Sequence, residues 1–214
     1  ETLLASAWAA CGRCGSMIIQ LNDLTKIYNF QRILDHLNLS FTDEAPCCLM
    51  GPSGSGKTTL LRILLGLERP DGGSYSITGE NGSDLTGSVR FAAVFQEDRL
   101  CEAFTPVENI QMVTGRALSG EQIRGELSRL LPPECFDRPV WTMSGGMKRR
   151  TAICRAVLAR SQALLMDEPF TGLDEDNRRL AIRYIREKAA GRLLILTTHQ
   201  EEDVELIGGR LVRL

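Results

Sequence analysis

The chain has 214 residues, of which 43% are hydrophobic, and its formal net charge is −2 at pH 7. This length suits one large α/β core or two modest ones. The weakly acidic balance excludes a global positive field that would attract nucleic acid or an anionic membrane.

The first sixteen residues precede any regular strand pattern. The apolar run 3–10 is far shorter than the roughly 20 residues of a membrane span, and Cys11 and Cys14 form a lone CxxC to which we assign no role. The seven cysteines are scattered, which favours a reduced chain. We predict that residues 1–16 are an N-terminal extension, disordered or foreign to the native chain, and that Met17 is the natural start.

Alternating strand and helix signals follow residue 17. The first half is predicted to hold strands at 17–21, 45–50, 74–78 and 89–95 and a helix at 57–67. Helical stretches then replace the strand signal, which predicts an inserted helical subdomain at 105–143. The rest is predicted to hold helices at 145–160 and 175–190 and strands at 163–166 and 193–197. Uniformly apolar strands favour a mainly parallel sheet with helices on both faces, beside a small antiparallel portion.

A phosphate-binding loop stands between a predicted strand and a predicted helix. The segment Gly51-Pro52-Ser53-Gly54-Ser55-Gly56-Lys57-Thr58 has the spacing GxxxxGK[ST]. Glycines let backbone N–H groups approach a β-phosphate, and the following helix presents the positive end of its dipole. Lys57 is expected to reach the β- and γ-phosphates and the Thr58 hydroxyl to bind Mg²⁺. The loop predicts an ATP site that comprises Gly51, Pro52, Ser53, Gly54, Ser55, Gly56, Lys57, Thr58 and Thr59.

Two adjacent carboxylates follow the predicted strand 163–166. Strand pleating would send the side chains of Asp167 and Glu168 in opposite directions. Asp167 is then expected to orient Mg²⁺ or its water, while Glu168 polarises an attacking water. A solvated strand end is the alternative, and the loop upstream makes it the weaker one.

A turn of small residues opens the predicted helix 145–160. The segment Met143-Ser144-Gly145-Gly146-Met147 precedes a basic run and an Ala-Ile-Cys-Arg-Ala stretch. It resembles the signature of ATP-binding cassette (ABC) proteins, which usually reads Leu-Ser-Gly-Gly-Gln. Met147 replaces the glutamine and lacks its amide donor, whereas the serine hydroxyl, the glycine N–H groups and the helix dipole remain. An isolated Ser-Gly-Gly would otherwise be a plain helix N-cap.

Other residues stand where this family places its functional motifs. Gln96 follows a predicted strand like the Q-loop glutamine, Asp174 lies in a Gly-Leu-Asp-Glu segment like the D-loop, and His199 follows two threonines like the switch histidine. Tyr28 precedes the phosphate-binding loop at about the distance of the aromatic that stacks on adenine. The resemblance covers residues 17–214 and implies a single nucleotide-binding domain of the P-loop NTPase fold.

The resemblance also implies an ATPase that works as a head-to-tail homodimer. ATP on the Lys57 loop of one subunit would be capped by Ser144, Gly145, Gly146 and Met147 of the other. Glu168 would be the general base, with His199, Gln96 and Lys57 completing the catalytic group. Thr58, Gln96 and Asp167 would hold Mg²⁺.

The partners implied are separate membrane permease subunits, and indirectly an extracytoplasmic substrate-binding protein. The chain would then be cytoplasmic and peripheral on the inner face of the membrane. Segments 94–100 and 106–110 resemble importer cassettes, so import is the preferred direction, and Phe104 is expected either to line the permease-facing groove or to lie in the core. Alternatives are a nucleic-acid-associated ABC-type ATPase, although no nucleic acid is expected, and a nucleotide-gated module that does not hydrolyse ATP.

Overall fold

The computed structural model describes residues 16–214. The predicted N-terminal extension, apart from residue 16, and the pair Cys11 and Cys14 lie outside the described residues. None of the helices in the described part is both long and apolar enough to cross a bilayer.

A small antiparallel sheet contains the first two strands. It has the order β2-β1-β4, with β1 at Ile18–Tyr28, β2 at Gln31–Thr42 and β4 at Gly72–Thr78. Residues 29 and 30 turn the β1–β2 hairpin with positive φ angles of 49° and 64°, as two-residue hairpin turns require. This sheet is the predicted antiparallel portion.

The second sheet has five strands in the order β5-β6-β7-β3-β8, and every neighbouring pair is parallel. The strands are β3 Cys47–Met50, β5 Phe91–Val94, β6 Ala163–Met166, β7 Leu193–Thr197 and β8 Arg210–Arg213. Parallel strands end at the same edge of a sheet, where α/β proteins bind their ligands. The loops that follow β3, β5, β6 and β7 therefore converge on one edge.

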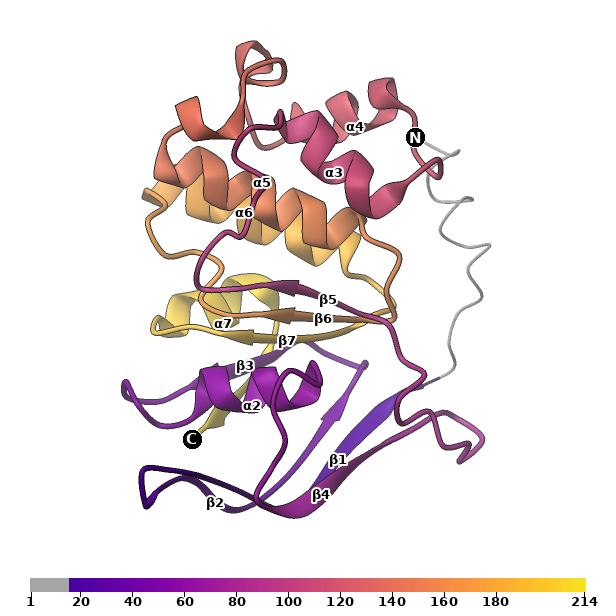
Figure 1. Ribbon diagram of the computed structural model, residues 1–214, viewed down its shortest axis with the longest axis vertical. Coiled ribbons are helices and arrows are strands. Elements are labelled where there is room, and N and C mark those ends of the chain that lie inside the picture. Colours follow the sequence, from indigo (N-terminus) through magenta and orange to yellow (C-terminus); the bar gives the residue numbers. More distant parts are fainter. Residues whose placement is uncertain (1–15) are drawn as a thin grey trace.

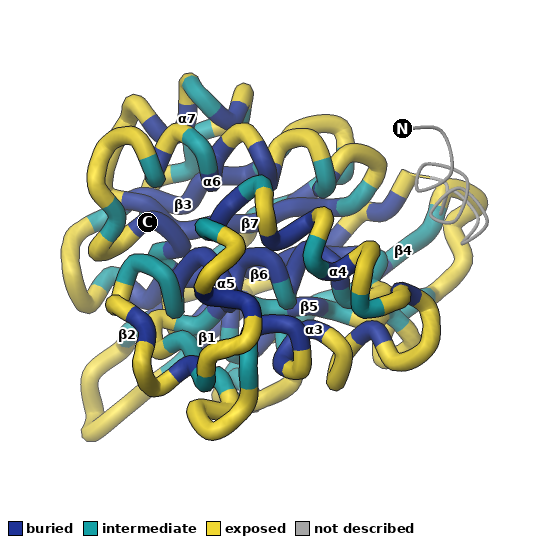
Figure 2. The backbone as a smooth tube through the Cα atoms, turned by 90° about the horizontal axis from the view of Figure 1, so that it is seen from above, coloured by how far each residue is buried: buried dark blue, intermediate teal, exposed yellow. Residues whose placement is uncertain are grey.

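Both faces of the parallel sheet are buried. Along β6, Leu164 and Met166 belong to one hydrophobic cluster, while Ala163 and Leu165 belong to a second one. The alternation follows from the two-residue period of a strand. Figure 2 shows the same strands as a buried centre surrounded by exposed loops. The prediction of a parallel sheet covered on both faces is confirmed.

Helices form the outer layers (Figure 1). α2 (Lys57–Leu64) lies between the parallel sheet and the antiparallel sheet, and α5 (Gly145–Leu158) and α6 (Glu175–Lys188) cover the opposite face. Beyond α5 lie α3 (Pro106–Thr114) and α4 (Gly120–Leu127). Residues 105–143 also contain the short 3₁₀ helices Pro133–Cys135 and Val140–Thr142, and α7 is Glu201–Ile207.

Some elements differ from the sequence prediction. β1 continues to Tyr28 rather than ending at residue 21, and β2, α7 and β8 had no predicted counterpart. β2 lies at the edge of its sheet and mixes exposed and buried positions without regular alternation. Irregularities in its register with β1 break the two-residue period on which strand prediction depends.

Five cysteines fall within the described residues, and all five are free thiols. Cys101 is exposed and the other four are buried. Burial raises the pKa of Cys47 to about 11 and that of Cys48 to about 12, because a thiolate loses its hydration there. These two β3 thiols therefore act as small apolar side chains.

Candidate functional site

The phosphate-binding loop joins β3 to α2 at the ligand-binding edge. A Cβ atom added to Gly56 would stand 2.5 Å from Leu34 Cδ2 and 2.9 Å from the carbonyl oxygen of Ile33. Gly56 also has φ of 94°, a conformation that side chains disfavour. Position 56 is therefore restricted to glycine for two reasons, and the loop rests against β2.

Two side chains of this loop are suited to phosphate. Lys57 is only 6% exposed, and its Nζ donates to the carbonyl oxygens of Gly51 at 2.7 Å and Pro52 at 3.1 Å. Ser55 Oγ is buried without a hydrogen-bond partner in the part of the chain that the structure describes. A buried unpaired hydroxyl is uncommon in native proteins. An ammonium group, an unpaired hydroxyl and the backbone N–H groups thus fit the phosphates of a nucleotide.

Asp167 follows β6 and is buried next to β7. Its Oδ1 accepts a hydrogen bond from Thr197 Oγ1 at 2.8 Å, and Thr197 Oγ1 accepts one from the backbone N–H of Glu168 at 2.7 Å. One buried hydroxyl therefore fixes both acidic residues. Thr197 was not among the predicted site residues, and a polar residue at the end of an otherwise apolar strand was the available signal.

Glu168 is held at both carboxylate oxygens. His199 Nε2 lies 2.7 Å from Oε1, and Thr171 Oγ1 donates to Oε2 at 3.2 Å. The backbone of Glu168 has φ of 47°, which is uncommon outside glycine and characteristic of functional sites. β6 ends at Met166 as predicted, and beyond it hydrogen bonds with Thr197, Thr171 and His199 hold the two acidic residues.

Glu168 and His199 line a cleft of about 390 Å³ together with Arg178 and Asp203. Asp203 is buried and accepts a hydrogen bond from Thr198 Oγ1, and burial raises the pKa of its carboxyl group. Arg178 is also buried and ion-pairs with Asp203 at 3.4 Å. His199, the predicted switch residue, therefore lies next to a buried arginine and a buried carboxylate that the sequence pattern did not indicate as functional.

The remaining predicted residues lie near the same edge. Gln96 is exposed just after β5. Ser144 caps α5 by accepting from the N–H of Met147 at 3.3 Å, and Asp174 caps α6 by accepting from the N–H of Asn177 at 2.9 Å. The hydrogen bond from Asn177 lowers the pKa of the Asp174 carboxyl group. The predicted D-loop and the predicted signature turn are neighbours, because a Cβ atom on Gly146 would lie 3.5 Å from Gly172 O.

Tyr28 ends β1 with 39% of its surface exposed. Its hydroxyl donates to the Glu68 carboxylate just beyond α2, and Lys26 Nζ lies 5.2 Å from the centre of its ring. Glu68 also pairs with Arg62 of α2 at 3.1 Å. These contacts fix the ring on the hairpin that packs against the phosphate-binding loop.

The predicted Mg²⁺ ligands Thr58, Gln96 and Asp167 offer oxygens from three separate segments, and Gln96 is the one that follows β5. Thr58 is exposed at the start of α2, and Asp167 lies after β6. No group of three or more His, Cys, Asp or Glu residues within 16–214 could hold a metal ion alone. Mg²⁺ is usually bound by one or two protein oxygens together with substrate phosphates, so this donor set fits it.

Comparison with known proteins identifies the family. Residues 34–171 match the family model described as ABC transporter. The chain belongs to the ABC transporter family. It carries the ATP-binding ATPase domain of that family, as predicted.

Curated ABC relatives include both exporters and importers by name. The chain is 38% identical to the Nod factor export ATP-binding protein I of Ralstonia nicotianae over 88% of this chain and 61% of that protein. It is 32% identical to the spermidine/putrescine import ATP-binding protein PotA of Mannheimia succiniciproducens, over 92% and 55%. The chain thus spans less than two thirds of the length of these relatives.

Solved ABC structures share the fold. One of them is a dimeric ATP-binding cassette in a post-hydrolysis state, bound to ADP and Pi. Its sequence is 25% identical to this chain and its TM-score is 0.77. The match covers 92% of this chain and 94% of that one. A bacterial Atm1-family ABC exporter with ATP bound is 22% identical and has the same TM-score. The fold prediction, a P-loop NTPase with a mainly parallel sheet, is confirmed.

Met147, in the predicted ABC signature turn, packs against the large hydrophobic cluster under α5. Because Ser144 and the glycines keep their donors without it, we expect Met147→Gln to retain turnover within about threefold, which is a change of about 0.7 kcal/mol in the activation free energy. A phosphate-release assay checks this. A strong loss would show that the signature turn has been assigned incorrectly.

Proposed function

We propose that this chain hydrolyses ATP as the motor subunit of a transporter, in a head-to-tail dimer that closes over the nucleotide. The observation that carries the proposal is the Glu168 carboxylate, fixed by His199 and Thr171 at the sheet edge that also bears the Lys57 loop. A positioned carboxylate beside a phosphate-binding loop suits in-line attack of water on a γ-phosphate.

Each residue of the proposed site has a separate task. Glu168 takes a proton from the attacking water. His199 holds the Glu168 carboxylate in place and also contacts the γ-phosphate. Gln96 positions the water, and Lys57 counters charge that develops on the transferring group. Thr58, Gln96 and Asp167 would hold Mg²⁺, which supplies charge neutralisation at the β- and γ-phosphates when bound.

We propose that the adenine ring of ATP stacks on the ring of Tyr28. Its ring is fixed by Glu68, remains partly exposed and belongs to the hairpin packed against Gly56. Base-to-aromatic stacking depends on such a preset ring orientation. The P-loop residues from Gly51 to Thr59 would hold the phosphates.

The signature turn acts in trans in this proposal. Ser144, Gly145, Gly146 and Met147 form the N-terminal turn of α5, on the face of the sheet opposite α2 (Figure 1). A helix N-terminus with free N–H groups favours an anion. ATP would therefore bridge two copies, and loss of the γ-phosphate would release them.

Mixing two inactive variants tests the shared site. Lys57→Ala removes the phosphate-binding lysine, and Ser144→Arg blocks the signature turn. In a mixed dimer one site carries both changes, while the other is made of two unchanged halves. We expect each variant alone to be inactive. An equal mixture should regain activity at up to one quarter of the wild-type sites, because half of the dimers are mixed and each of these has one intact site. A mixture as inactive as its parts would contradict the head-to-tail dimer.

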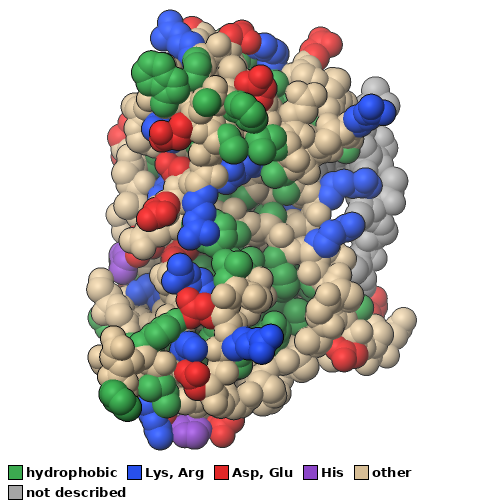
Figure 3. Space-filling model, in the orientation of Figure 1, with side chains coloured by type: hydrophobic (Ala, Val, Ile, Leu, Met, Phe, Trp, Pro, Cys, Tyr) green, Lys and Arg blue, Asp and Glu red, His purple; other side chains and the backbone are tan. Residues whose placement is uncertain are grey.

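The permease surface is proposed on the helical subdomain 105–143 of the single domain 17–214. Phe104 and Trp141 are 44% and 64% exposed, and the N–H of Val140 donates to Phe104 O at 2.9 Å, which joins the two backbone segments that carry these aromatics. Hydrophobic side chains gather on this part of the molecule in Figure 3. Such a patch suits a short helix of a membrane partner. The chain would thus be peripheral on the cytoplasmic face.

We favour import, because segments 94–100 and 106–110 resemble importer cassettes. Relatives carry both import and export in their names, so direction has to be tested on this protein. Pull-down from native membranes is expected to recover a multi-span permease and, through it, an exported binding protein. Recovery of a permease without any binding protein, together with outward transport in vesicles, would reverse the assignment.

A further inference from the structure

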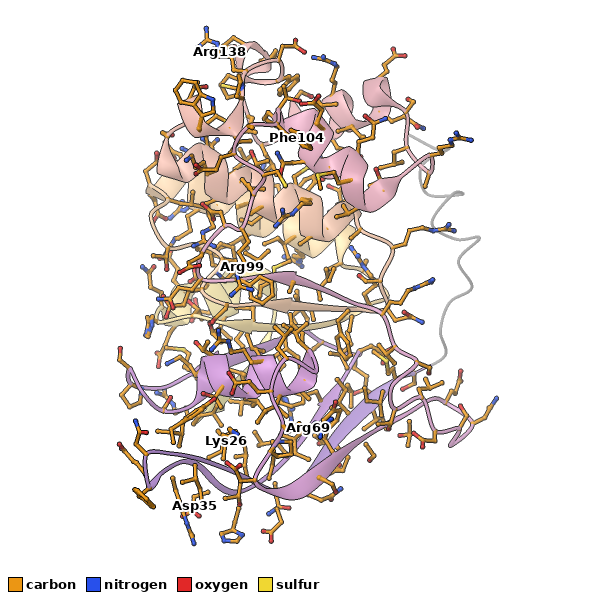
Figure 4. All side chains as sticks on the ribbon, in the orientation of Figure 1. Lys26, Asp35, Arg69, Arg99, Phe104 and Arg138 are labelled. Carbon is orange, nitrogen blue, oxygen red and sulfur yellow. The ribbon has the colours of Figure 1, made fainter. Side chains whose placement is uncertain are left out.

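The segment that leaves β5 is attached to α5 rather than to the phosphate-binding loop. It runs from Phe95 through Gln96 and passes α5 on its way to α3, as the labels Arg99 and Phe104 mark in Figure 4. Four of its backbone carbonyl groups accept hydrogen bonds from two arginines of α5. These groups belong to residues 95, 96, 98 and 99.

Arg149 makes the contact nearest to the site. It is 6% exposed, and its guanidinium group donates to the carbonyl oxygen of Phe95 at 2.7 Å and to that of Gln96. The planar fork of an arginine can hold two adjacent acceptors at once, whereas an ammonium group has no fixed fork. The backbone of Gln96 is therefore bound directly by α5.

Asp98 supplies the countercharge. Its Oδ1 lies 3.2 Å from Arg149 Nη1 and is buried without a hydrogen bond among the described residues, so the contact is an ion pair rather than a directed hydrogen bond. Burial raises the pKa of the Asp98 carboxyl group. A buried arginine needs such a partner, because an uncompensated charge in the interior is costly.

We infer that Arg149 is a positioning residue that makes Gln96 move together with the signature helix. Ser144 starts the same helix, five residues before Arg149, which is about 7.5 Å along the axis. Arg155 secures the far end of the segment through the carbonyl oxygens of Arg99 at 2.8 Å and Asp98 at 3.1 Å. A rotation of α5 would thus bring Ser144 and Gln96 to their ligands in one step. This inference rests on the proposed roles of Gln96 and Ser144.

The test combines two measurements on four proteins: Arg149→Met, Gln96→Ala, the double variant, and the control Arg160→Met at an exposed position beyond α5. We expect Arg149→Met to lower the turnover number at least about tenfold, because misplacing a reacting group by about 1 Å can cost on the order of 100-fold. The Kd for ATP should stay within about twofold, since Arg149 does not contact the phosphate-binding loop. The double variant should be no slower than Gln96→Ala alone, and Arg160→Met should match the wild type.

Hydrogen exchange supplies a readout that does not need hydrolysis. Amides of residues 95–99 should exchange at least about tenfold faster in Arg149→Met, while those of 51–58 stay unchanged. Additive losses of turnover in the double variant, or unchanged exchange at 95–99, would overturn the inference. If the wild type binds ATP without hydrolysing it, the proposed function fails, and the exchange result still decides whether Arg149 holds the segment.

A second variant, Asp98→Asn, keeps the inference testable if Arg149→Met does not fold. Asp98→Asn keeps the shape of the side chain but leaves Arg149 without its carboxylate. It should shift turnover and exchange in the same direction as Arg149→Met, by a smaller factor. Wild-type values for both quantities in Asp98→Asn, alongside an unfolded Arg149→Met, would also reject the positioning role.

Discussion

Replacing Glu168 by Gln is expected to lower ATP turnover by about 10²- to 10⁴-fold, the range in which a positioned general base contributes. The amide has nearly the same shape, so contacts with Thr171 and His199 can persist while the proton acceptor is lost. Binding of ATP should be retained, because no phosphate-binding group changes. The variant should therefore accumulate as an ATP-bound dimer.

Phosphate release and gel filtration with ATP measure the two halves of this prediction. Glu134→Gln, which makes the same change at an exposed position of the helical subdomain, is the matched control and should behave as the wild type. Wild-type turnover in Glu168→Gln would remove Glu168 from the catalytic role. Loss of ATP binding would instead show that the carboxylate supports the nucleotide site itself.

Replacing Glu126 by Leu is expected to lower the free energy of unfolding by about 3 kcal/mol, near the lower end for breaking a buried ion pair. Glu126 lies on α4, is 4% exposed and accepts from Lys188 Nζ at 2.6 Å and from Tyr184 Oη at 3.1 Å, both on α6. Without it Lys188 loses its countercharge. Burial raises the pKa of Tyr184, so that hydroxyl stays a neutral donor that needs an acceptor.

Urea unfolding followed by circular dichroism measures this effect. The double variant Glu126→Leu/Lys188→Leu should recover part of the loss, because it removes the unpaired charge of Lys188 and leaves only the Tyr184 hydroxyl without its Glu126 acceptor. Glu121→Leu, at an exposed position on the same helix, should change the free energy by no more than about 0.5 kcal/mol. Equal losses in the single and double variants would show that packing, and not the ion pair, stabilises this contact.

The sequence predicted what depends on local pattern. β6 and β7 have the predicted bounds, because continuous apolar runs between turn residues leave few alternatives. The phosphate-binding loop was identified because its chemistry requires fixed residue types at fixed spacing. The functional roles assigned to its residues stay predictions until the variants are measured.

What the sequence could not supply are contacts between residues far apart in the chain. Thr197 joins Asp167 to Glu168 across two strands, and Arg149 binds the backbone of Gln96. Neither contact leaves a periodic signal, since one uses a single hydroxyl and the other a carbonyl group that every residue has. The left-handed backbone of Glu168 is likewise a product of tertiary contacts, because glutamate does not favour it.

The strand order of the parallel sheet determines how late the protein can fold during its synthesis. β3 carries the phosphate-binding loop, and its two neighbours are β7 and β8, which come near the end of the chain. During synthesis β3 stays unpaired until β7 (Leu193–Thr197) has left the ribosome, and its other edge stays open until β8 (Arg210–Arg213) has followed. Such long-range pairing slows folding and exposes aggregation-prone edges. The phosphate-binding loop is thus translated long before the two strands that pair with its own strand, and chaperone protection matters most in that interval.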